Sequence, residues 1–314
     1  MPGCGYNEKM RILLDNVDFS STSGPNHFGS KIKKYFKRLG YECGNNLKDP
    51  NIQLSFIEIV NRYPDIPIVQ RLDGIYFDIG KNNELLNSNI FNSYKSASGV
   101  IFQSEYSRQL VTKYFGDYKN SVVIHNGADM DYIEDVEPLK DPEFDKYDNI
   151  WCCASKWRGW KRLRENIRYF LEYSNENDCL VVAGTPEPHE FVSNPRVYFV
   201  GELDIRTLFS LYKASKYFIH LARYDACPNV VVDASACGCE VICTSLGGTK
   251  EVAGPGATVI VEDEWNFELV DVNNPPNLDF SKTTINTINN RVDMQYTSQK
   301  YIEFLQGIYD EQFS

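Results

Sequence analysis

The segment that constrains the fold most is Arg223-Tyr-Asp-Ala-Cys-Pro-Asn-Val-Val-Val-Asp-Ala-Ser-Ala-Cys-Gly-Cys-Glu-Val-Ile242. Pro228 suits the first turn of a helix, because its missing N–H would have no partner there. We therefore predict a helix from about Asn229 to Ala236, whose first backbone N–H groups point at whatever lies ahead of the helix. A phosphate is the natural occupant of that position.

Two carboxylates flank this predicted helix start. Asp225 lies in the loop before it, and Asp233 lies about one turn inside it. Carboxylates accept hydrogen bonds from hydroxyl groups, so Asp233 can reach a ribose while Asp225 reaches a sugar at the other end of a diphosphate. The segment predicts a nucleotide-sugar site. An ordinary loop carboxylate and a solvated helix carboxylate are the alternative, since Asp is common in both settings.

The segment also resembles a known family, the retaining glycosyltransferases of family 4, which have the GT-B fold. That family carries two glutamates at this eight-residue spacing, followed by Ala-x-x-x-Gly-x-x-Val. Five further blocks resemble the family and occur in its order: Arg71-Leu-Asp-Gly74, Gln103-Ser-Glu-Tyr-Ser107, His125-Asn-Gly-Ala-Asp129, Lys156-Trp-Arg-Gly-Trp-Lys-Arg162 and Gly247-Gly-Thr-Lys-Glu251. Both family glutamates are aspartates here, which withdraws each carboxylate by roughly 1.5 Å.

The fold class is α/β, because predicted strands and helices alternate along the chain and so predict parallel sheets covered by helices. The resemblance implies GT-B, with two Rossmann-like domains facing across a cleft and a C-terminal helix crossing back to the first domain. The expected domains are 1–135 for the acceptor and 150–292 for the nucleotide sugar, joined by a linker at 136–149 and followed by the helix at 293–314. Residues 134–148 carry seven acidic and two basic residues with two prolines, which is typical of a linker near a hinge.

Apolar runs and turn residues predict the individual elements. In the first half, strands are expected at 10–14, 52–59, 67–71, 99–103 and 121–125, with a helix at 28–39 closed by Gly40. In the second half, strands are expected at 150–154, 179–183, 196–200, 217–220, 240–244 and 257–261, with helices at 163–173 and 205–214. Two helical stretches should finish the chain, the last over about 297–309.

Transfer of a sugar from a nucleoside diphosphate places negative charge on the departing diphosphate. Arg158 and Lys161, with Lys156 and Arg162 close by, are the side chains suited to hold that charge. Backbone N–H groups near Asn229 and Gly248 add further donors. Trp157 and Trp160 are interpreted as packing residues of this cluster, with stacking on a base as the alternative.

The resemblance implies specific roles. Asp225 would bind donor-sugar hydroxyls and Asp233 the ribose, with no enzymic nucleophile. Asp73 lies near the position where many relatives have a histidine. Its predicted partner is either the donor sugar or the acceptor. The catalytic candidates are Asp225, Arg158, Lys161 and Asp73. The donor-binding candidates are Asp233, Pro228, Asn229, Val230, Gly24, Gly184, Glu202, Leu203 and Gly248. The acceptor candidates are His27, Asn26 and Arg71.

Charge and hydropathy limit the partners. The net charge of -11 argues against nucleic acid, whose binding draws on clustered Lys and Arg. No apolar run approaches the roughly 20 residues of a membrane span, and the start has no signal-peptide hydrophobic region, so a cytoplasmic location is expected. One predicted helix is basic and is interpreted either as a solvated face or as a peripheral membrane contact. Its charged residues are Lys31, Lys33, Lys34, Lys37 and Arg38.

The nine cysteines include no Cys-x-x-Cys pair and lie largely in apolar runs, so they are interpreted as reduced core residues and no metal site is expected. His125 and His220 end apolar runs and are interpreted as core or edge histidines. No cofactor is expected beyond the nucleoside diphosphate sugar, with UDP or GDP as its nucleotide.

The predicted function is metal-independent, retaining transfer of a hexose from this donor to a glycan, lipid or protein-linked acceptor. A sugar-nucleotide-binding or scaffold protein that kept the fold without turnover is the alternative. A nicotinamide-dependent oxidoreductase is disfavoured, because no Gly-x-Gly-x-x-Gly turn follows the first strand.

Overall fold

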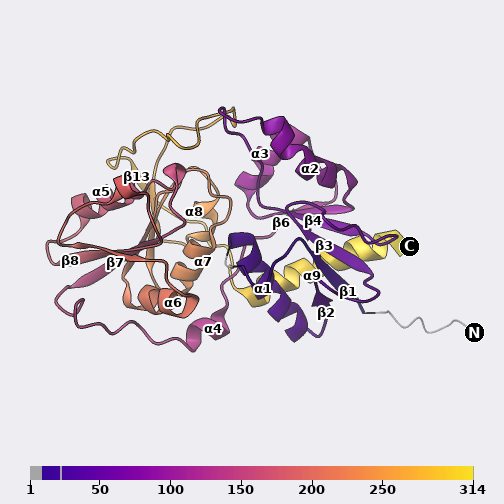
Figure 1. The fold of residues 1–314 in the computed structure, drawn as a ribbon, viewed down its shortest axis with the longest axis horizontal. Helices are drawn as coiled ribbons and strands as arrows, with labels where there is room; N and C mark the ends of the chain where they lie inside the picture. Colours follow the sequence, from indigo (N-terminus) through magenta and orange to yellow (C-terminus); the bar gives the residue numbers. More distant parts are fainter. Residues whose placement is uncertain (1–8, 22, 314) are drawn as a thin grey trace, which may run out of the picture.

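The computed structural model describes residues 9–21 and 23–313, and these form two α/β domains (Figure 1). In the first domain the sheet order is β2-β1-β3-β4-β5-β6, and all its strand pairs are parallel. The strands are β1 Arg11–Asp15, β2 Glu42–Gly44, β3 Ile52–Phe56, β4 Ile68–Leu72, β5 Gly99–Phe102 and β6 Ser121–Val123. The helices are α1 Gly24–Arg38, α2 Asn83–Ser96 and α3 Glu105–Phe115.

The second domain has the sheet order β13-β12-β11-β10-β7-β8-β9. Its strands are β7 Asn149–Ala154, β8 Asp178–Ala183, β9 Val197–Gly201, β10 Tyr217–His220, β11 Glu240–Thr244, β12 Thr258–Ile260 and β13 Thr283–Ile285. Its helices are α5 Leu163–Tyr173, α6 Ile205–Ala214, α7 Asn229–Ala236 and the short α8 Thr249–Val252. The 3-10 turns η1 Gly159–Lys161 and η2 Pro188–Glu190 and the helix α4 Met130–Glu134 lie in connections.

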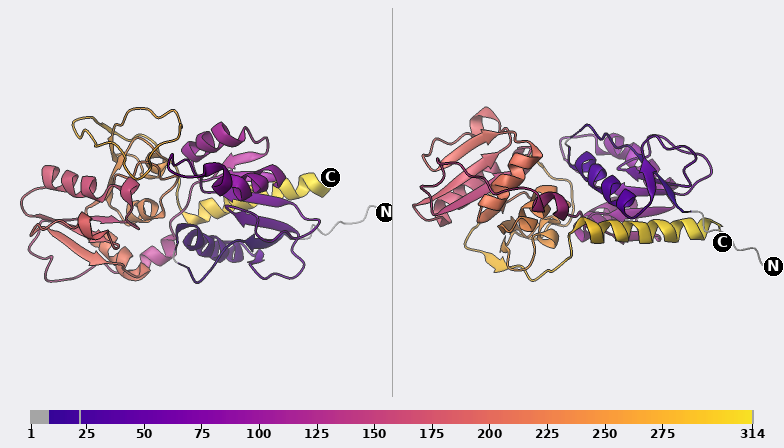
Figure 2. Two further views of the ribbon diagram at one scale, coloured as in Figure 1. Left: turned by 45° about the horizontal axis from the view of Figure 1, so that its top comes forward. Right: turned by 90° about the horizontal axis from the view of Figure 1, so that it is seen from below.

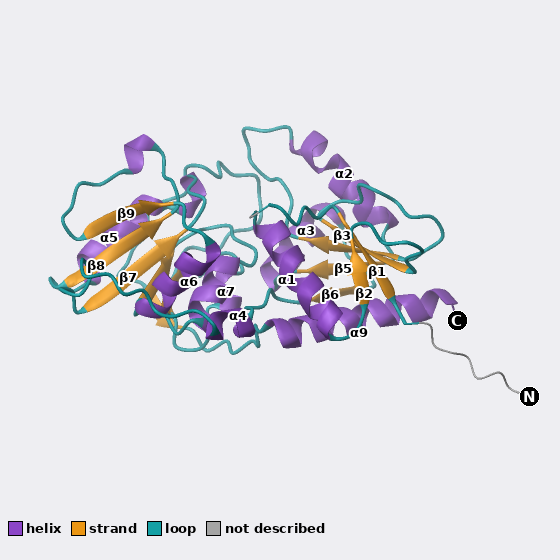
Figure 3. Cartoon of the chain, turned by 60° about the horizontal axis from the view of Figure 1, so that its bottom comes forward, coloured by secondary structure: helices purple, strands orange, loops and turns teal. Residues whose placement is uncertain are grey.

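Helices cover both faces of each sheet, as the strand and helix colours of Figure 3 show. In the first domain α1 packs on one face, and α2 and α3 pack on the other. In the second domain α6 and α7 cover one face and α5 covers the other. The central strands β3, β4, β5 and β8 are buried at every residue, as parallel strands covered by helices on both faces are.

Several predicted boundaries need correction. The first helix begins at Gly24 rather than near Phe28, because Pro25 already occupies its first turn. Strand β3 ends at Phe56, since Ile57 turns the chain with a φ of 68°. The predicted pair of C-terminal helical stretches is wrong: within the described residues one helix, α9 Met294–Phe313, is preceded by β13, which pairs with β12 as an antiparallel edge strand.

The last helix returns to the first domain, where it lies along the sheet beside α1 (Figure 2). Met294, Tyr301, Leu305 and Ile308 are buried in the same apolar cluster as the core of α1. This confirms the expected crossing, and the first domain is completed by residues from the far end of the chain.

The two connections between the domains run side by side. The N–H of Ala128 donates to the carbonyl of Val292 at 2.7 Å, and the N–H of Met294 donates to the carbonyl of Ala128 at 2.9 Å. A Cβ on Gly127 would lie only 2.7 Å from backbone atoms of Asp293 and Met294, so only glycine permits this approach. The acidic segment that follows packs on the second domain through buried Val136 and Phe144.

The guanidinium of Arg71 ties α9 to the end of strand β4. Arg71 is fully buried; its Nε donates to the hydroxyl of Tyr301 at 3.1 Å, its Nη2 donates to Asn126 Oδ1 at 2.9 Å, and its Nη1 pairs with Asp73. The guanidinium also lies 4.2 Å from the ring centre of Phe28 on α1. A buried charge is tolerated only when its hydrogen bonds are satisfied, so these partners have to come together when the domain folds.

No helix in the described ranges is long and apolar enough to cross a membrane.

The Arg71 contact generates a prediction for stability. Tyr301→Phe removes the acceptor of the Nε hydrogen and leaves a buried donor unpaired, so we expect a loss of about 1–3 kcal/mol in the free energy of unfolding. Urea titration followed by tryptophan fluorescence measures it. The control is Tyr296→Phe on the same helix, whose ring is half-buried beside Arg291 and Lys300. Equal stability of the two variants would contradict this role of Arg71.

Candidate active site

A cleft of about 790 Å³ lies between the two domains, at the carboxyl ends of both parallel sheets. Ligands of open α/β sheets bind at this edge. All the predicted site residues except Gly248, Asn26 and Arg162 line the cleft. From the first domain these are Gly24, His27, Arg71 and Asp73. From the second they are Arg158, Lys161, Gly184, Glu202, Leu203, Asp225, Pro228, Asn229, Val230 and Asp233.

Asp225 is held by two basic groups on one side of its carboxylate. His220 Nε2 lies 2.6 Å from Oδ2, and Lys161 Nζ is paired with the same oxygen. Burial alone would raise the pKa of the Asp225 carboxyl, but the Lys161 ammonium and the hydrogen bond from His220 outweigh it and lower the pKa. Asp225 is therefore ionised at neutral pH, and its Oδ1 is left for another donor.

His220 is a buried histidine at the end of a strand, as its sequence position indicated, and it contacts the site through Asp225. It ends strand β10, is buried, and has a pKa lowered by that burial against the opposing effect of Asp225. A histidine at the carboxyl end of a strand next to the cleft is the signal that could have assigned it.

Asp233 is buried on α7 and pairs across the domain boundary with Lys31 of α1. Lys31 Nζ lies 2.7 Å from Asp233 Oδ1 and 3.2 Å from the carbonyl of Gly127, and both side chains are about 5% exposed. Burial raises the pKa of the Asp233 carboxyl, and Lys31 opposes that rise. The expected ribose carboxylate therefore meets the first domain directly.

This pair corrects the interpretation of the basic helix for Lys31 alone; the solvated face and the membrane contact both stay predictions for the other basic residues. Lys31 cannot contact a membrane, because it is buried at the domain boundary. Lys34 is paired with Asp129, and Arg38 is paired with Asp131. The other two basic residues of this predicted surface, Lys33 and Lys37, also lie on α1.

His27 lines the cleft beside this pair. Its Nε2 lies 3.9 Å from Asp233 Oδ2 and has no hydrogen-bond partner among the described residues. Burial lowers the pKa of His27 to about 4, and the nearby Lys31 charge contributes to this shift as the smaller cause. The imidazole is therefore neutral at pH 7 and can accept or donate a hydrogen bond in the cleft.

The basic cluster after β7 divides into two parts. Arg158 and Lys156 are exposed at the cleft, and neither forms an ion pair within the described ranges. Trp157 is buried in the core and donates to the carbonyl of Ala183 at 2.9 Å, which confirms packing for that residue. Trp160 lies at the cleft, where Lys161 Nζ is 4.2 Å from its ring centre.

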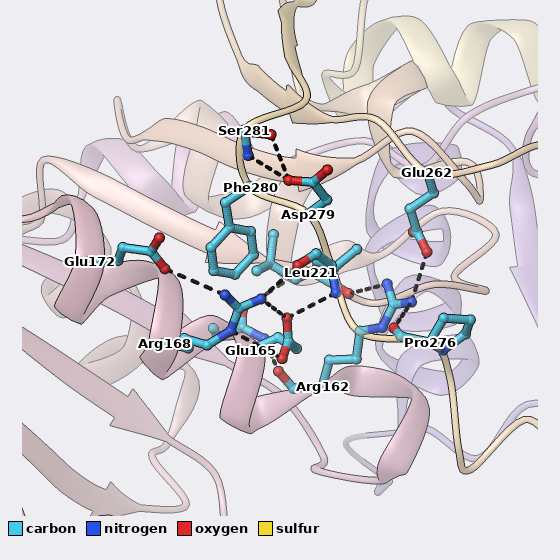
Figure 4. Close-up of polar contacts among 12 residues, drawn as sticks. Arg162, Glu165, Arg168, Glu172, Leu221, Glu262, Pro276, Asp279, Phe280 and Ser281 are labelled. Atoms are coloured by element: carbon cyan, nitrogen blue, oxygen red, sulfur yellow. Dashed lines mark hydrogen bonds and ion pairs between the residues drawn. The ribbon is translucent and has the colours of Figure 1, made fainter.

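Arg162 is not part of the cleft lining, and its side chain points to Glu262 and Pro276, as Figure 4 shows. Its Nη2 donates to Glu262 Oε2 at 2.7 Å and to the carbonyl of Pro276 at 2.9 Å, and its Nη1 reaches the carbonyl of Leu221 at 3.4 Å. The sequence grouped Arg162 with the phosphate-binding cations, and this is wrong. A left-handed φ of 54° at Arg162, between η1 and α5, redirects its side chain into the domain.

The N-terminus of α7 faces the cleft as predicted. Pro228 is its N-cap, and the helix begins at Asn229. Asn229 Nδ2 donates to the carbonyl of Gly24 in the first domain at 3.1 Å, whereas Asn229 Oδ1 is buried with no partner among the described residues. The N–H groups at this helix start are available to an anion between the domains.

Gly184 follows strand β8 with a φ of 94°, and its N–H donates to the carbonyl of Gly201 at 2.7 Å. A Cβ there would meet the carbonyl oxygen of Ser155 at 2.0 Å, so the turn requires glycine. Glu202 and Leu203 follow Gly201 along the same wall of the cleft.

Gly248 and Asn26 support the site from outside the cleft lining. The N–H of Gly248 donates to the carbonyl of Asp225 at 2.7 Å, which uses the backbone donor expected to reach phosphate. Asn26 Oδ1 accepts from the N–H of Asp18 at 3.0 Å. Arg71 lines the cleft, and its charge is paired with Asp73. Burial raises the pKa of the Asp73 carboxyl, and the charge of Arg71 opposes that rise.

Glu251 is a functional contact to which the sequence assigned no role. Its two carboxylate oxygens accept from the N–H groups of Glu105 and Tyr106, at 2.8 and 3.0 Å, and Oε2 lies 2.9 Å from His125 Nε2. It therefore binds the positive end of the first-domain helix α3 from the second domain.

Within the described part of the chain, no three His, Cys, Asp or Glu side chains are grouped so as to hold a metal ion. Metal independence remains a prediction.

Comparison with known proteins identifies the fold. Residues 149–274 match the family model described as glycosyl transferases group 1. HepE from Anabaena, solved in complex with UDP and glucose, is 16% identical with a TM-score of 0.65, and the match covers 95% of this chain and 100% of HepE. No curated protein sequence matches the chain.

Two further solved structures agree. A glycosyltransferase from Rickettsia africae is 16% identical with a TM-score of 0.64, covering 96% of this chain and 99% of that one. WaaG, a glycosyltransferase involved in lipopolysaccharide biosynthesis, is 13% identical with a TM-score of 0.58, covering 96% and 94% of the two chains. The chain has the GT-B fold, and most of its second domain matches the group 1 glycosyltransferase family model.

The depressed pKa of His27 generates a prediction. Below its ordinary pKa of 6.5 the unfolded state binds a proton that folded His27, with a pKa of about 4, does not bind. Stability should therefore fall as the pH drops below 6.5, by about 2 kcal/mol at pH 5 from this group. His27→Gln should lose this part of the pH dependence of the free energy of unfolding, whereas His189→Gln, at an exposed position, should keep it. Equal pH slopes in both variants would overturn the assignment.

Proposed function

We propose that this chain, which carries a group 1 glycosyltransferase domain, transfers a hexose from a UDP-sugar or GDP-sugar to an acceptor hydroxyl in the interdomain cleft. One observation carries the proposal: the ionised Asp225, fixed by Lys161 and His220, lies in the same cleft as exposed Arg158 and the N-terminus of α7. A carboxylate for sugar hydroxyls thus lies close to cationic and backbone donors for a diphosphate.

The diphosphate of the proposed donor would bind to basic side chains that can still form hydrogen bonds. Arg158 is exposed in the cleft, and Lys161 has ammonium hydrogens beyond the one given to Asp225. Charge-assisted bonds to phosphate are about twice as strong as neutral ones. Together with the N–H groups of Asn229 and Val230, these cations compensate the charge that develops on the leaving diphosphate, and no metal ion is required for that purpose.

The two aspartates bind hydroxyl groups through their remaining oxygens. Lys161 and His220 both contact Oδ2 of Asp225, so Oδ1 can accept from the donor sugar. Lys31 contacts Oδ1 of Asp233, so Oδ2 can accept from the ribose. Because each carboxylate is fixed by a basic neighbour, it is oriented before substrate arrives, which lowers the ordering cost of binding.

We further propose that the reaction retains the anomeric configuration without an enzymic nucleophile. Asp225 is the carboxylate nearest the expected sugar, and its tight pairing with Lys161 and His220 suits hydrogen bonding rather than attack on carbon. The solved HepE complexes contain UDP and UDP-glucose, which makes UDP-glucose the first donor to test. A binding protein without turnover is the second candidate, and release of diphosphate separates the two.

Arg158→Ala tests the proposed donor site. We expect kcat/KM for the donor to fall by roughly 10²-fold, since a preorganised charge on the leaving group is removed. The measurements are calorimetric binding of UDP- and GDP-sugars and release of nucleoside diphosphate, each with and without EDTA. Arg164→Ala on α5 is the control, because Arg164 is exposed outside the cleft and its hydrogen bond within the described residues goes to the carbonyl of His189.

Three outcomes are informative. Tight binding of the donor and EDTA-insensitive release of nucleoside diphosphate support the metal-independent transferase, provided that Arg158→Ala loses both and Arg164→Ala keeps both. Binding without release, even with a broad panel of hydroxyl acceptors, supports the binding protein. The absence of binding to any sugar nucleotide would reject the donor assignment.

A further inference from the structure

The cleft extends beyond the donor residues into a region that the proposed donor does not use. We call this region the apolar lobe; it is lined by Ile57, Ile75, Phe77, Ile90, Leu110 and Tyr224. Five of these come from the first domain, while Tyr224 precedes Asp225 in the second. The rings of Phe77 and Tyr224 meet edge to face, with centres 5.3 Å apart, and so join the two domains in one apolar wall.

Two buried hydroxyl groups line the cleft without partners. Tyr106 is 8% exposed and Ser107 is 0% exposed, both line the cleft, and neither hydroxyl has a hydrogen-bond partner among the described residues. Buried polar groups in folded proteins nearly always have a partner. Unpaired hydroxyls on two consecutive residues in the wall of a cavity therefore indicate a ligand that supplies polar groups there.

Tyr106 lines the cleft together with Tyr224 of the apolar lobe and with Asp225. Burial raises the pKa of Tyr106, and the nearby Tyr224 and Asp225 raise it further. Its ring also faces Trp265 and Phe267, at centre distances of 6.4 and 5.8 Å, which holds the side chain in place. A molecule that bonds to Tyr106 is thereby brought towards the sugar held by Asp225.

We propose that the apolar lobe binds the acceptor, and that this acceptor is a hydroxylated molecule with a compact, ring-sized apolar group, such as an aryl glycoside. Its polar part bonds to the hydroxyls of Tyr106 and Ser107, and its apolar part lies against Phe77 and Leu110. This inference rests on the proposed function.

In the transfer, the acceptor oxygen forms the bond to the anomeric carbon while the bond from that carbon to the diphosphate oxygen breaks. The acceptor's proton leaves on the diphosphate, so atoms and charge balance without a further reactant.

The chemistry of the wall favours this class over a free sugar. A free sugar would bring hydroxyl groups to every side, whereas most of the lobe surface offers no hydrogen bond, and burying an unpaired hydroxyl is unfavourable. An apolar ring matches these side chains and gains from their burial. The rings of Phe77 and Tyr224 offer a wall on which a single ring can pack, which favours a compact ring over a long chain.

Matched acceptors test the inference. With the best-bound UDP-sugar as donor, kcat/KM is measured for the methyl, p-nitrophenyl and octyl glycosides of glucose, galactose, mannose and N-acetylglucosamine. We expect the p-nitrophenyl member of at least one set to exceed its methyl partner at least tenfold. Equal rates for the two would overturn the apolar-acceptor assignment, and a tenfold preference for octyl over p-nitrophenyl would overturn the compact group.

Variants locate the effect in the lobe. Tyr106→Phe keeps the ring and removes the hydroxyl, so the acceptor KM should rise at least fivefold with a smaller change in kcat. The control is Tyr114→Phe on the same helix, whose hydroxyl donates to the carbonyl of Phe267 outside the cleft. An unchanged acceptor KM in Tyr106→Phe would contradict the role of this hydroxyl.

Ile57→Asn tests the apolar wall itself. Asn tolerates the left-handed backbone found at Ile57, with its φ of 68°, so the variant should fold. The ratio of p-nitrophenyl to methyl rates should fall towards one, and an unchanged ratio would exclude Ile57 from the acceptor site. Calorimetry with the donor alone distinguishes failure of the proposed function from failure of this inference. If no sugar nucleotide binds, the proposed function fails. Donor turnover without a preference for aryl acceptors rejects only this inference.

Discussion

The ion pair between Lys31 and Asp233 is the contact on which the arrangement of the two domains depends. Both charges are buried, and an isolated buried charge is so unfavourable that removing either partner typically costs 3–5 kcal/mol. The pair therefore fixes how closely α1 approaches α7. Two other cross-domain contacts act in the same sense: Asn229 bonds to Gly24 beside the pair, and Glu251 binds the N-terminus of α3. Each of them joins a helix start of one domain to the other, so the cleft is assembled from groups that need a partner across the boundary.

This arrangement gives the cleft two chemically different halves. Around Asp225 and Arg158 the walls carry paired and free charges, which suit a diphosphate and its sugar. Around Phe77 and Tyr224 the walls are apolar and aromatic. The halves meet near Tyr106, whose unpaired hydroxyl belongs to the apolar half while its electrostatic neighbours include Asp225. The proposed transfer requires donor and acceptor to meet at one carbon atom, and two different halves of one cleft can hold the two molecules at once.

The sequence predicted the fold well where the signal is local. Pro228 and the apolar run after it placed α7, and the alternation of strands and helices gave both parallel sheets. It failed where the outcome depends on tertiary contacts. Basic residues on α1 look alike in the sequence, and nothing local marks Lys31 as the one that meets a carboxylate about two hundred positions later. Arg162 was misassigned because a single left-handed residue reverses its direction, and a propensity for that conformation is weak outside Gly and Asn. The edge strand β13 is exposed and short, so it carries no apolar pattern.

The aspartates that stand where the resembling family has glutamates acquire a physical explanation from their neighbours. A side chain shorter by one methylene has fewer rotamers and cannot reach as far, so a hydroxyl must come closer to it. Here a lysine ammonium contacts one oxygen of each shortened carboxylate: Lys161 contacts Asp225 Oδ2, and Lys31 contacts Asp233 Oδ1. This contact holds the carboxylate in one orientation. Since Lys31 comes from the first domain, the Asp233 carboxylate is oriented only when the domains are together. The proposed binding of the ribose by Asp233 is therefore linked to domain contact, whereas Asp225 is oriented within the second domain alone.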